Sequence, residues 1–268
     1  SYNNYNDIFA ALTISKSLPK NIGTVIVKHA NPCGVSIKRN HLESYKSAFT
    51  CDPISAFGGI VSCNFKITKI LAIEMSKLFL EVIIANNFDT SALKILKKKK
   101  NLRLIDASNY KANDGLKHVS LNNEILIQSE DLKKFTTKDL KIVSKRKPTS
   151  KDMKNLIFAF NVCRYVKSNA IVLAANETTV GIGSGQPSRL DSCKIAIDKM
   201  KKFTNTNENL VAASDAFFPF IDGIEKLVQS GVQAVIQPSG SIRDKDVIKF
   251  ANETDTVLIF SKTRHFRH

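Results

Sequence analysis

Apolar residues along this chain gather in short runs that alternate with longer amphipathic stretches. The short runs predict strands at 24–27, 59–62, 82–84, 124–127, 170–173, 179–182, 232–236 and 257–260, of which 24–27 and 82–84 are suited to buried strands. The longer stretches repeat apolar residues at helical spacing and predict helices at 42–49, 68–80, 151–166, 189–201, 223–229 and 244–251. Alternation of this kind predicts an α/β protein built on layered sheets.

One polar segment interrupts this alternation and is the best candidate for a linker. Residues 144–150 are polar and basic, and Pro148 breaks any regular element there. We therefore expect two α/β halves, residues 1–148 and residues 149–268, each with its own layered sheet. No short internal repeat and no low-complexity segment is visible.

Composition places the chain among ordinary globular proteins. Of its 268 residues, 43% are hydrophobic and 24% are charged. No apolar run approaches the roughly 20 residues that a membrane span needs. The polar N-terminus resembles neither a signal peptide nor a transit peptide, and it lacks an initiator Met. We expect a cytoplasmic fragment of a longer protein, with no membrane partner.

The net charge of +16 points to an anionic ligand. No aromatic residues interleave the densest lysine run, at 97–100, and no RNA-binding motif occurs. An anionic small molecule is therefore favoured over nucleic acid. The five cysteines are odd in number and form no CxxC pair, so we interpret them as small buried residues rather than as disulfides or zinc ligands.

The first candidate for chemistry is the run Lys28-His29-Ala30-Asn31-Pro32-Cys33-Gly34, where a predicted strand ends. Side chains at strand ends in α/β folds often meet ligands. A lysine beside a histidine can lower the histidine pKa and keep its imidazole free to accept a proton. Taken alone, this pair is weak support for a catalytic site, and a chance Lys-His neighbourhood is the simpler interpretation.

Three further stretches combine turn residues with polar or aromatic groups. Residues 51–59 contain Pro and paired Gly, which make a tight turn that a flat ligand could approach. The same residues are also typical of an ordinary loop without a ligand. Residues 167–170 precede the glycine-rich stretch 181–189, whose spacing fits neither nucleotide fingerprint but could hold an anion with Arg189. Residues 214–222 place three phenylalanines between aspartates, suited to a planar heterocycle or simply to a core. The basic C-terminus, residues 264–268, directly follows an apolar strand.

A zinc nucleoside deaminase is one alternative, because such enzymes use H-x-E followed by P-C-x-x-C. Here Asn31 stands in place of the catalytic Glu, and Ser36 stands in place of the second Cys. Zinc needs three protein ligands and an open position, which this segment does not supply. We therefore expect no zinc.

Together these stretches resemble the AICAR transformylase family, the formyltransferase half of the bifunctional enzymes of purine (IMP) biosynthesis. The matching motifs run in order through almost the whole chain: KHANPCG, CDPISAFGG, KSNAI, GIGSGQPSR, SDAFFPF, IQPSGSIRD and RHFRH. The resemblance implies two cytidine-deaminase-like subdomains of α/β/α layers. It also implies formyl transfer from 10-formyltetrahydrofolate to the 5-amino group of AICAR, in a homodimer whose subunits share active sites.

The resemblance also implies roles for individual residues. Lys28 and His29 would be the catalytic pair, with His29 moving protons at the attacking amine, and Asn169 would stabilise the developing oxyanion. The residues that would contact AICAR are Glu81, Arg189, Phe217, Arg264 and His268. The folate pocket would contain Ile54, Gly58, Phe220 and Asp222. Some members bind a potassium ion, for which Asp215 is the candidate ligand.

Two departures from the family pattern bear on these roles. The IMP cyclohydrolase domain and a short R-Y-G segment are missing on the N-terminal side, so cyclohydrolase activity is expected only in the missing part and AICAR binding is expected to be weaker. A Gly-Gly pair is replaced by 121–124. A non-catalytic module that binds folate or nucleotide stays open as a second alternative.

Overall fold

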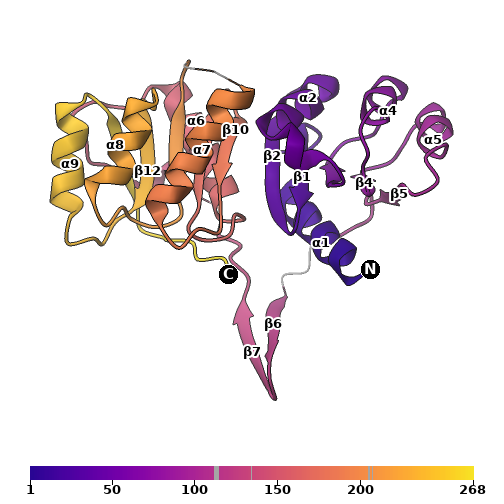
Figure 1. The fold of residues 1–268 in the computed structure, drawn as a ribbon, viewed down its shortest axis with the longest axis horizontal. Coiled ribbons are helices and arrows are strands. Elements are labelled where there is room, and N and C mark those ends of the chain that lie inside the picture. The colour runs from indigo at the N-terminus through magenta and orange to yellow at the C-terminus, as the bar shows by residue number, and fades with distance from the viewer. Residues whose placement is uncertain (112–114, 134, 205, 207) are drawn as a thin grey trace.

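The computed structural model describes residues 1–111, 115–133, 135–204, 206 and 208–268. The strands of its main sheet are β1 (Gly23–Lys28), β2 (Asn31–Ile37), β3 (Ile60–Cys63), β4 (Val82–Ala85), β5 (Arg103–Asp106), β8 (Leu140–Ile142), β9 (Ile171–Ala175), β10 (Thr178–Gly183), β11 (Val211–Ser214), β12 (Ala234–Pro238) and β13 (Val257–Ser261). Within the described residues these eleven strands form one continuous sheet, in the order β5-β4-β3-β1-β2-β10-β9-β11-β12-β13-β8 (Figure 1).

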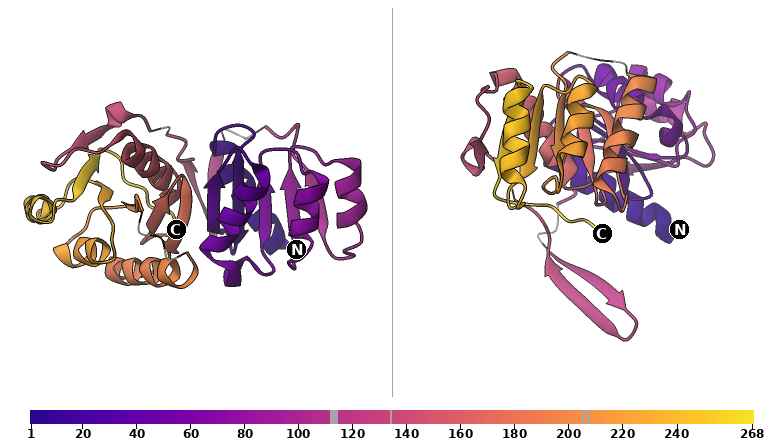
Figure 2. Two further views of the ribbon diagram at one scale, coloured as in Figure 1. Left: turned by 90° about the horizontal axis from the view of Figure 1, so that it is seen from above. Right: turned by 60° about the vertical axis from the view of Figure 1, so that its left-hand side comes forward.

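Helices cover both faces of this sheet (Figure 2). They are α1 (Tyr2–Ser17), α2 (His41–Cys51), α3 (Pro53–Ala56), α4 (Lys69–Met75), α5 (Thr90–Leu96), α6 (Ser150–Cys163), α7 (Arg189–Phe203), α8 (Ile221–Gln229) and α9 (Asp244–Glu253), with a short 3-10 turn at Thr137–Asp139. Alternate residues of β1 face opposite layers: Val25 and Val27 pack in the core beneath α1 and α6, and Ile26 packs in the core beneath α2 and α4. The prediction of a layered α/β fold is confirmed, but the expectation of a separate sheet in each half is wrong, because β2 pairs with β10 and joins the two halves into one sheet.

The two halves of the sheet repeat one plan. Apart from the short helix α3, the order α1-β1-β2-α2-β3-α4-β4-α5-β5 returns as α6-β9-β10-α7-β11-α8-β12-α9-β13. In each half, an antiparallel hairpin is followed by a strand antiparallel to its first member and then by two parallel strands. The halves meet where β2 lies beside β10, with Ser36 and Thr178 hydroxyls 2.8 Å apart. This repeat lies in the topology; no repeated motif in the sequence marks it, and only the family resemblance implied two similar subdomains.

The second sheet is a separate hairpin of β6 (Leu116–Leu121) and β7 (Glu124–Ser129). It projects away from the body, on the side where both chain ends lie (Figure 1). We call it the arm. The domain boundary at residue 148 stays a prediction, although β8 precedes that residue and pairs with β13 of the second half.

The buried positions agree with the interpretation of the cysteines. All five, Cys33, Cys51, Cys63, Cys163 and Cys193, are buried and free, and burial raises the pKa of Cys33 and of Cys51 to about 12. These thiols are therefore protonated packing groups near neutral pH. Across the described ranges, no helix is both long enough and apolar enough to cross a membrane.

Candidate active site

His29 and Ala30 form the two-residue turn that joins β1 to β2. Their φ angles are 53° and 57°, so both central residues adopt the left-handed conformation that a type I′ turn requires. Neither residue is glycine, and the conformation therefore needs support from outside the turn. Asp7 of α1 supplies it, because its carboxylate accepts hydrogen bonds from the backbone N–H groups of His29, at 3.0 Å, and Ala30, at 2.7 Å. The turn leaves His29 exposed at the end of the hairpin.

Lys28 precedes this turn and reaches toward α3. Its Nζ donates to the carbonyl oxygen of Phe57 at 2.7 Å. Gly58 follows Phe57 with a φ of 70°, a left-handed conformation that suits glycine, and Ile54 of α3 is 63% exposed. The backbone N–H of Glu81 donates to the carbonyl oxygen of Gly59, the residue after Gly58, at 3.1 Å. The Glu81 carboxylate forms an ion pair with Arg103 at 2.8 Å. The residues predicted to bind substrate in the first half therefore lie near Lys28.

Arg189, the first residue of α7, is the centre of a buried polar network in the second half. Its Nη1 donates to Ser214 Oγ at 2.9 Å and to the carboxylate of Asp215, which is fully buried. Its Nη2 donates to Asn169 Oδ1 at 2.5 Å. The second carboxylate oxygen of Asp215 accepts a hydrogen bond from Ser168 Oγ. The family resemblance implies that Arg189 contacts AICAR. In the structure the charge of Arg189 is already balanced by the carboxylate of Asp215.

Asn169 is held in a single orientation by this network. Its Nδ2 donates to the carbonyl oxygens of Gln186 and Pro187, both at 2.8 Å, while Oδ1 faces Arg189. Both amide protons are thus engaged, and a bond to a substrate oxyanion would replace one of these carbonyl contacts. The predicted role of Asn169 stays a prediction.

Asp215 is a poor cation ligand in this arrangement. One oxygen accepts a hydrogen bond from the Arg189 guanidinium and the other accepts one from the Ser168 hydroxyl, so a potassium ion would have to displace Arg189 from the carboxylate. Among the residues that the structure describes, no three His, Cys, Asp or Glu side chains gather as a metal site would require.

A cavity of about 490 Å³ opens beside this network. Its volume is within the range of roughly 300–1,000 Å³ that small-molecule sites occupy. Five of the predicted site residues line it: Asn169, Arg189, Phe217, Phe220 and Asp222. The other residues predicted for substrate, folate and catalysis are absent from the described lining of this cavity: Lys28, His29, Ile54, Gly58 and Glu81 of the first half, and Arg264 and His268 of the tail. The structure therefore brings one group of predicted residues together and leaves the first-half group apart from it.

The C-terminal tail is anchored against the same network. His265 is buried between Phe135 and Phe160, its backbone N–H donates to Asp215 O at 2.8 Å, and its Nδ1 contacts the Asp131 carboxylate. Burial raises the pKa of Asp131, but the hydrogen bond and charge of His265 outweigh burial and leave that pKa below its ordinary value. Sequence reasoning missed this pair, because nothing local marks Asp131.

The tail also carries two of the predicted AICAR contacts. Arg264 and His268 are exposed on either side of the buried His265. The Arg264 guanidinium lies over the ring of Phe266, 5.1 Å from its centroid, and Phe266 lines the cavity. Arg264 thus contacts a residue of the cavity lining without being part of that lining.

One hydrogen bond joins the turn of the first half to the network of the second. Asn31 Oδ1, two residues after His29, accepts from the backbone N–H of Lys167 at 2.9 Å. Ser168 N–H then donates to the tail at Arg267 O at 2.9 Å. Three motifs that are far apart in the sequence therefore share one region of the fold.

The comparison with known families agrees with this arrangement. The family model described as "AICARFT/IMPCHase bienzyme" matches residues 1–199. The chain belongs to this bienzyme family. Bifunctional purine biosynthesis proteins PurH from Persephonella marina, Buchnera aphidicola and Aquifex aeolicus are 44%, 46% and 44% identical to it. Each alignment covers 100% of this chain but only 52%, 51% and 52% of the relative, so the chain spans about half the length of these curated relatives.

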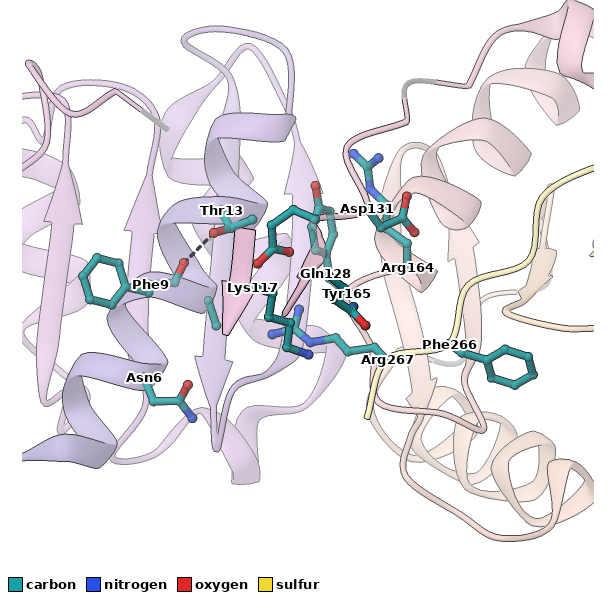
Figure 3. Close-up of a pocket in the computed structure, with 12 residues that line it drawn as sticks. Asn6, Phe9, Thr13, Lys117, Gln128, Asp131, Arg164, Tyr165, Phe266 and Arg267 are labelled. Carbon is teal, nitrogen blue, oxygen red and sulfur yellow. Dashed lines mark hydrogen bonds between the residues drawn. The ribbon is translucent and has the colours of Figure 1, made fainter. Parts of the chain in front are cut away.

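A second cavity, of about 260 Å³, lies between α1, the arm and the tail (Figure 3). Asn6 and Phe9 of α1, Lys117 and Gln128 of the arm, and Arg267 of the tail are among the residues that line it. Burial lowers the pKa of Arg267. Phe266 and Arg267 of the RHFRH motif are in its lining, but none of the residues to which the resemblance assigns a role is among the described lining.

Proposed function

We propose that this chain is a phosphoribosylaminoimidazolecarboxamide formyltransferase, which transfers formyl from 10-formyltetrahydrofolate to the 5-amino group of AICAR. Membership in the bienzyme family supports the reaction. The observation that carries the proposal is the convergence of Asn169, Arg189, Phe217, Phe220 and Asp222 on one cavity. These residues come from segments up to 53 positions apart (222 minus 169), so their meeting is a property of the fold.

The proposed reaction forms one bond and breaks another. The AICAR amine attacks the formyl carbon, the bond from that carbon to N10 of the folate breaks, one proton leaves the amine, and N10 gains one. His29 would accept the proton from the amine, with Lys28 beside it. Phe217 and Phe220 would stack on the planar rings, and Arg264 would bind the phosphate of AICAR.

No step of this reaction is routed through a metal ion. The surroundings of Asp215 do not fit a cation, since Arg189 already occupies its carboxylate. We therefore expect that potassium does not act on turnover through Asp215, so that turnover in sodium and in potassium buffers should not differ on account of this residue.

We further propose that the chain works as a homodimer with shared active sites. Ile54 and Gly58 stand apart from the cavity that Phe220 and Asp222 line, so a second copy would be needed to unite the predicted folate residues. The arm supports the proposal of a partner chain, because it exposes apolar side chains on both of its faces. These are Leu116, Val119, Leu121, Ile125, Leu126 and Ile127.

The test is a turnover assay with AICAR and 10-formyltetrahydrofolate, following the release of tetrahydrofolate. Formation of formylated AICAR supports the proposal. Tight binding of both ligands without turnover would instead support the non-catalytic module. Stoichiometric zinc together with release of ammonia from a nucleoside would support the deaminase alternative.

A further inference from the structure

The structural repeat places two side chains at equivalent positions. Asp7 is the sixth residue of α1, and Asn155 is the sixth residue of α6. Each lies beneath the two-residue turn of the hairpin that follows its helix. In the first half this turn is His29-Ala30, and in the second half it is Asn176-Glu177.

The two turns have the same backbone conformation. The φ angles are 53° and 57° in the first half and 52° and 53° in the second. All four residues are left-handed without being glycine, so each turn needs support from outside itself. The two halves of the chain therefore show how the same left-handed turn without glycine is stabilised in two different ways.

The helix residue supports the second turn position in both halves. Asn155 Oδ1 accepts from Glu177 N–H at 2.8 Å, and Asp7 Oδ1 accepts from Ala30 N–H at 2.7 Å. Only the first half adds a bond to the first turn position, where Asp7 Oδ2 accepts from His29 N–H at 3.0 Å. An amide has one acceptor oxygen and a carboxylate has two, so the acid at position 7 is what makes this additional bond available.

We propose that Asp7 is a positioning residue for His29, which holds the histidine backbone so that its imidazole is presented in one direction. The inference rests on the proposed function, because it assigns His29 the proton transfer. A charged acceptor makes stronger hydrogen bonds to N–H groups than a neutral one. Fixing both peptide N–H groups of the turn restricts the rotation that would otherwise swing an exposed side chain away from the amine.

The test is Asp7→Asn, which keeps the volume of the side chain and reproduces the residue found in the second half. We expect the His29 amide to exchange with solvent about 10-fold faster, while exchange at the Ala30 amide changes less than about 2-fold. We expect kcat to fall about 10-fold with KM for AICAR within about 2-fold, since the lost bond aligns the reacting group rather than the substrate.

Two further variants separate positioning from a general effect on folding. Asn155→Ala removes the equivalent support in the second half, and it should lower the melting temperature while leaving kcat unchanged. Ala30→Gly, added to Asp7→Asn, frees the turn further, so it should lower kcat again and should not restore it.

The outcomes are distinct. Faster His29 exchange with unchanged kcat would overturn the proposal, and so would equal losses of kcat in Asp7→Asn and Asn155→Ala. Unchanged His29 exchange in Asp7→Asn would also overturn it. If the wild-type chain shows no turnover while His29 exchange responds as expected, the proposed function fails and the Asp7 hydrogen bond to His29 stands.

Discussion

Arg189 fixes the side-chain amide of Asn169, with Nη2 donating to Oδ1 at 2.5 Å. The same guanidinium pairs with the fully buried Asp215. A buried ion pair contributes little net stability, but leaving one of its members alone is costly. Arg189 therefore acts on the candidate site through the orientation of Asn169 and through the charge of Asp215, in addition to any contact with AICAR.

The first prediction concerns removal of this charge. Arg189→Met should lower the free energy of unfolding by about 3 kcal/mol, because it leaves the Asp215 carboxylate buried without a cation. Urea unfolding measures this change. Arg243→Met is the matched control, since Arg243 forms an exposed pair with Asp246 at 3.3 Å and should cost less than about 1 kcal/mol.

A second substitution separates stability from activity at this site. Adding Asp215→Asn to Arg189→Met should restore much of the lost stability, because the buried charge is gone. It should not restore turnover, since Asn169 still lacks its guanidinium partner. Recovery of turnover in the double variant would show that Arg189 does not act through Asn169.

His29→Ala tests the proposed proton transfer. The backbone N–H that Asp7 binds is kept, so the turn should persist and AICAR should still bind. Turnover should fall by about 10²–10⁴-fold, the usual contribution of a general acid or base. Steady-state kinetics with a separate AICAR titration measures both effects. A variant that keeps more than about half of the wild-type rate would contradict this role.

Strands were predictable where packing alone decides the pattern, as in β1 and β9. Several elements were missed, among them α5, β5, β6, β8 and β11, and for two neighbours of β1 the physical reason is clear. The helix α1 carries asparagines, which are poor helix formers, and it exposes Tyr2, Tyr5 and Phe9 while burying Leu12 and Ile14, so its apolar residues do not mark a single face in the sequence. The strand β2 contains a proline and Gly34, where a Cβ atom would lie 1.9 Å from the carbonyl oxygen of Ala48, and such residues do not mark a strand in the sequence.

The candidate site was predictable as a set of motifs but not as a set of contacts. Asp7 and His29 are 22 positions apart, and Asp131 and His265 are 134 apart. No periodicity links residues at such separations, because their contact depends on how helices pack on the sheet. Short motifs therefore identify candidate residues such as His29. Only the fold shows that Asp7 contacts His29 and that Asp131 contacts His265.

A pH prediction follows from Asp52, which is buried at the junction of the two halves. Its Oδ1 caps α3 at the Ser55 N–H, 3.0 Å away, and its Oδ2 lies 2.7 Å from Lys199 Nζ on α7. Burial raises the pKa of Asp52, but the contacts with Lys199 and Ser55 outweigh burial and leave the pKa below its ordinary value. Since the folded pKa is depressed, Asp52 stabilises the fold above its unfolded pKa, and this stabilisation is lost as the pH falls through the folded pKa.

Asp52→Asn should therefore lower the free energy of unfolding at pH 7 by about 1–3 kcal/mol, and the difference from wild type should shrink below about pH 4. Urea unfolding between neutral and acidic pH measures it. Asp198→Asn, at an exposed position on α7, is the control and should follow the wild-type curve. A constant difference between Asp52→Asn and wild type at every pH would rule out the ion pair as the cause.

The last prediction concerns the arm and the proposed homodimer. Leu126 on one face of the arm is 53% exposed, and Ile127 on the other face is 58% exposed. A two-stranded hairpin is marginally stable by itself, and apolar surface on both faces marks an interaction site. Leu126→Lys and Ile127→Lys should each weaken self-association at least about 10-fold, because a lysine would be buried against the partner. Sedimentation equilibrium at micromolar concentrations measures this change.

Ile70→Lys on α4 is the matched control, since Ile70 is 66% exposed and lies outside the arm. It should leave association unchanged. Because Ile54 and Gly58 are expected to complete the cavity of the second copy, turnover per chain should fall together with association in the two arm variants. If the arm variants are monomeric but fully active, the proposal of shared active sites is refuted, while the proposal that the wild-type chain is a homodimer stands. Arm variants that associate as tightly as wild type would show that the dimer interface lies elsewhere.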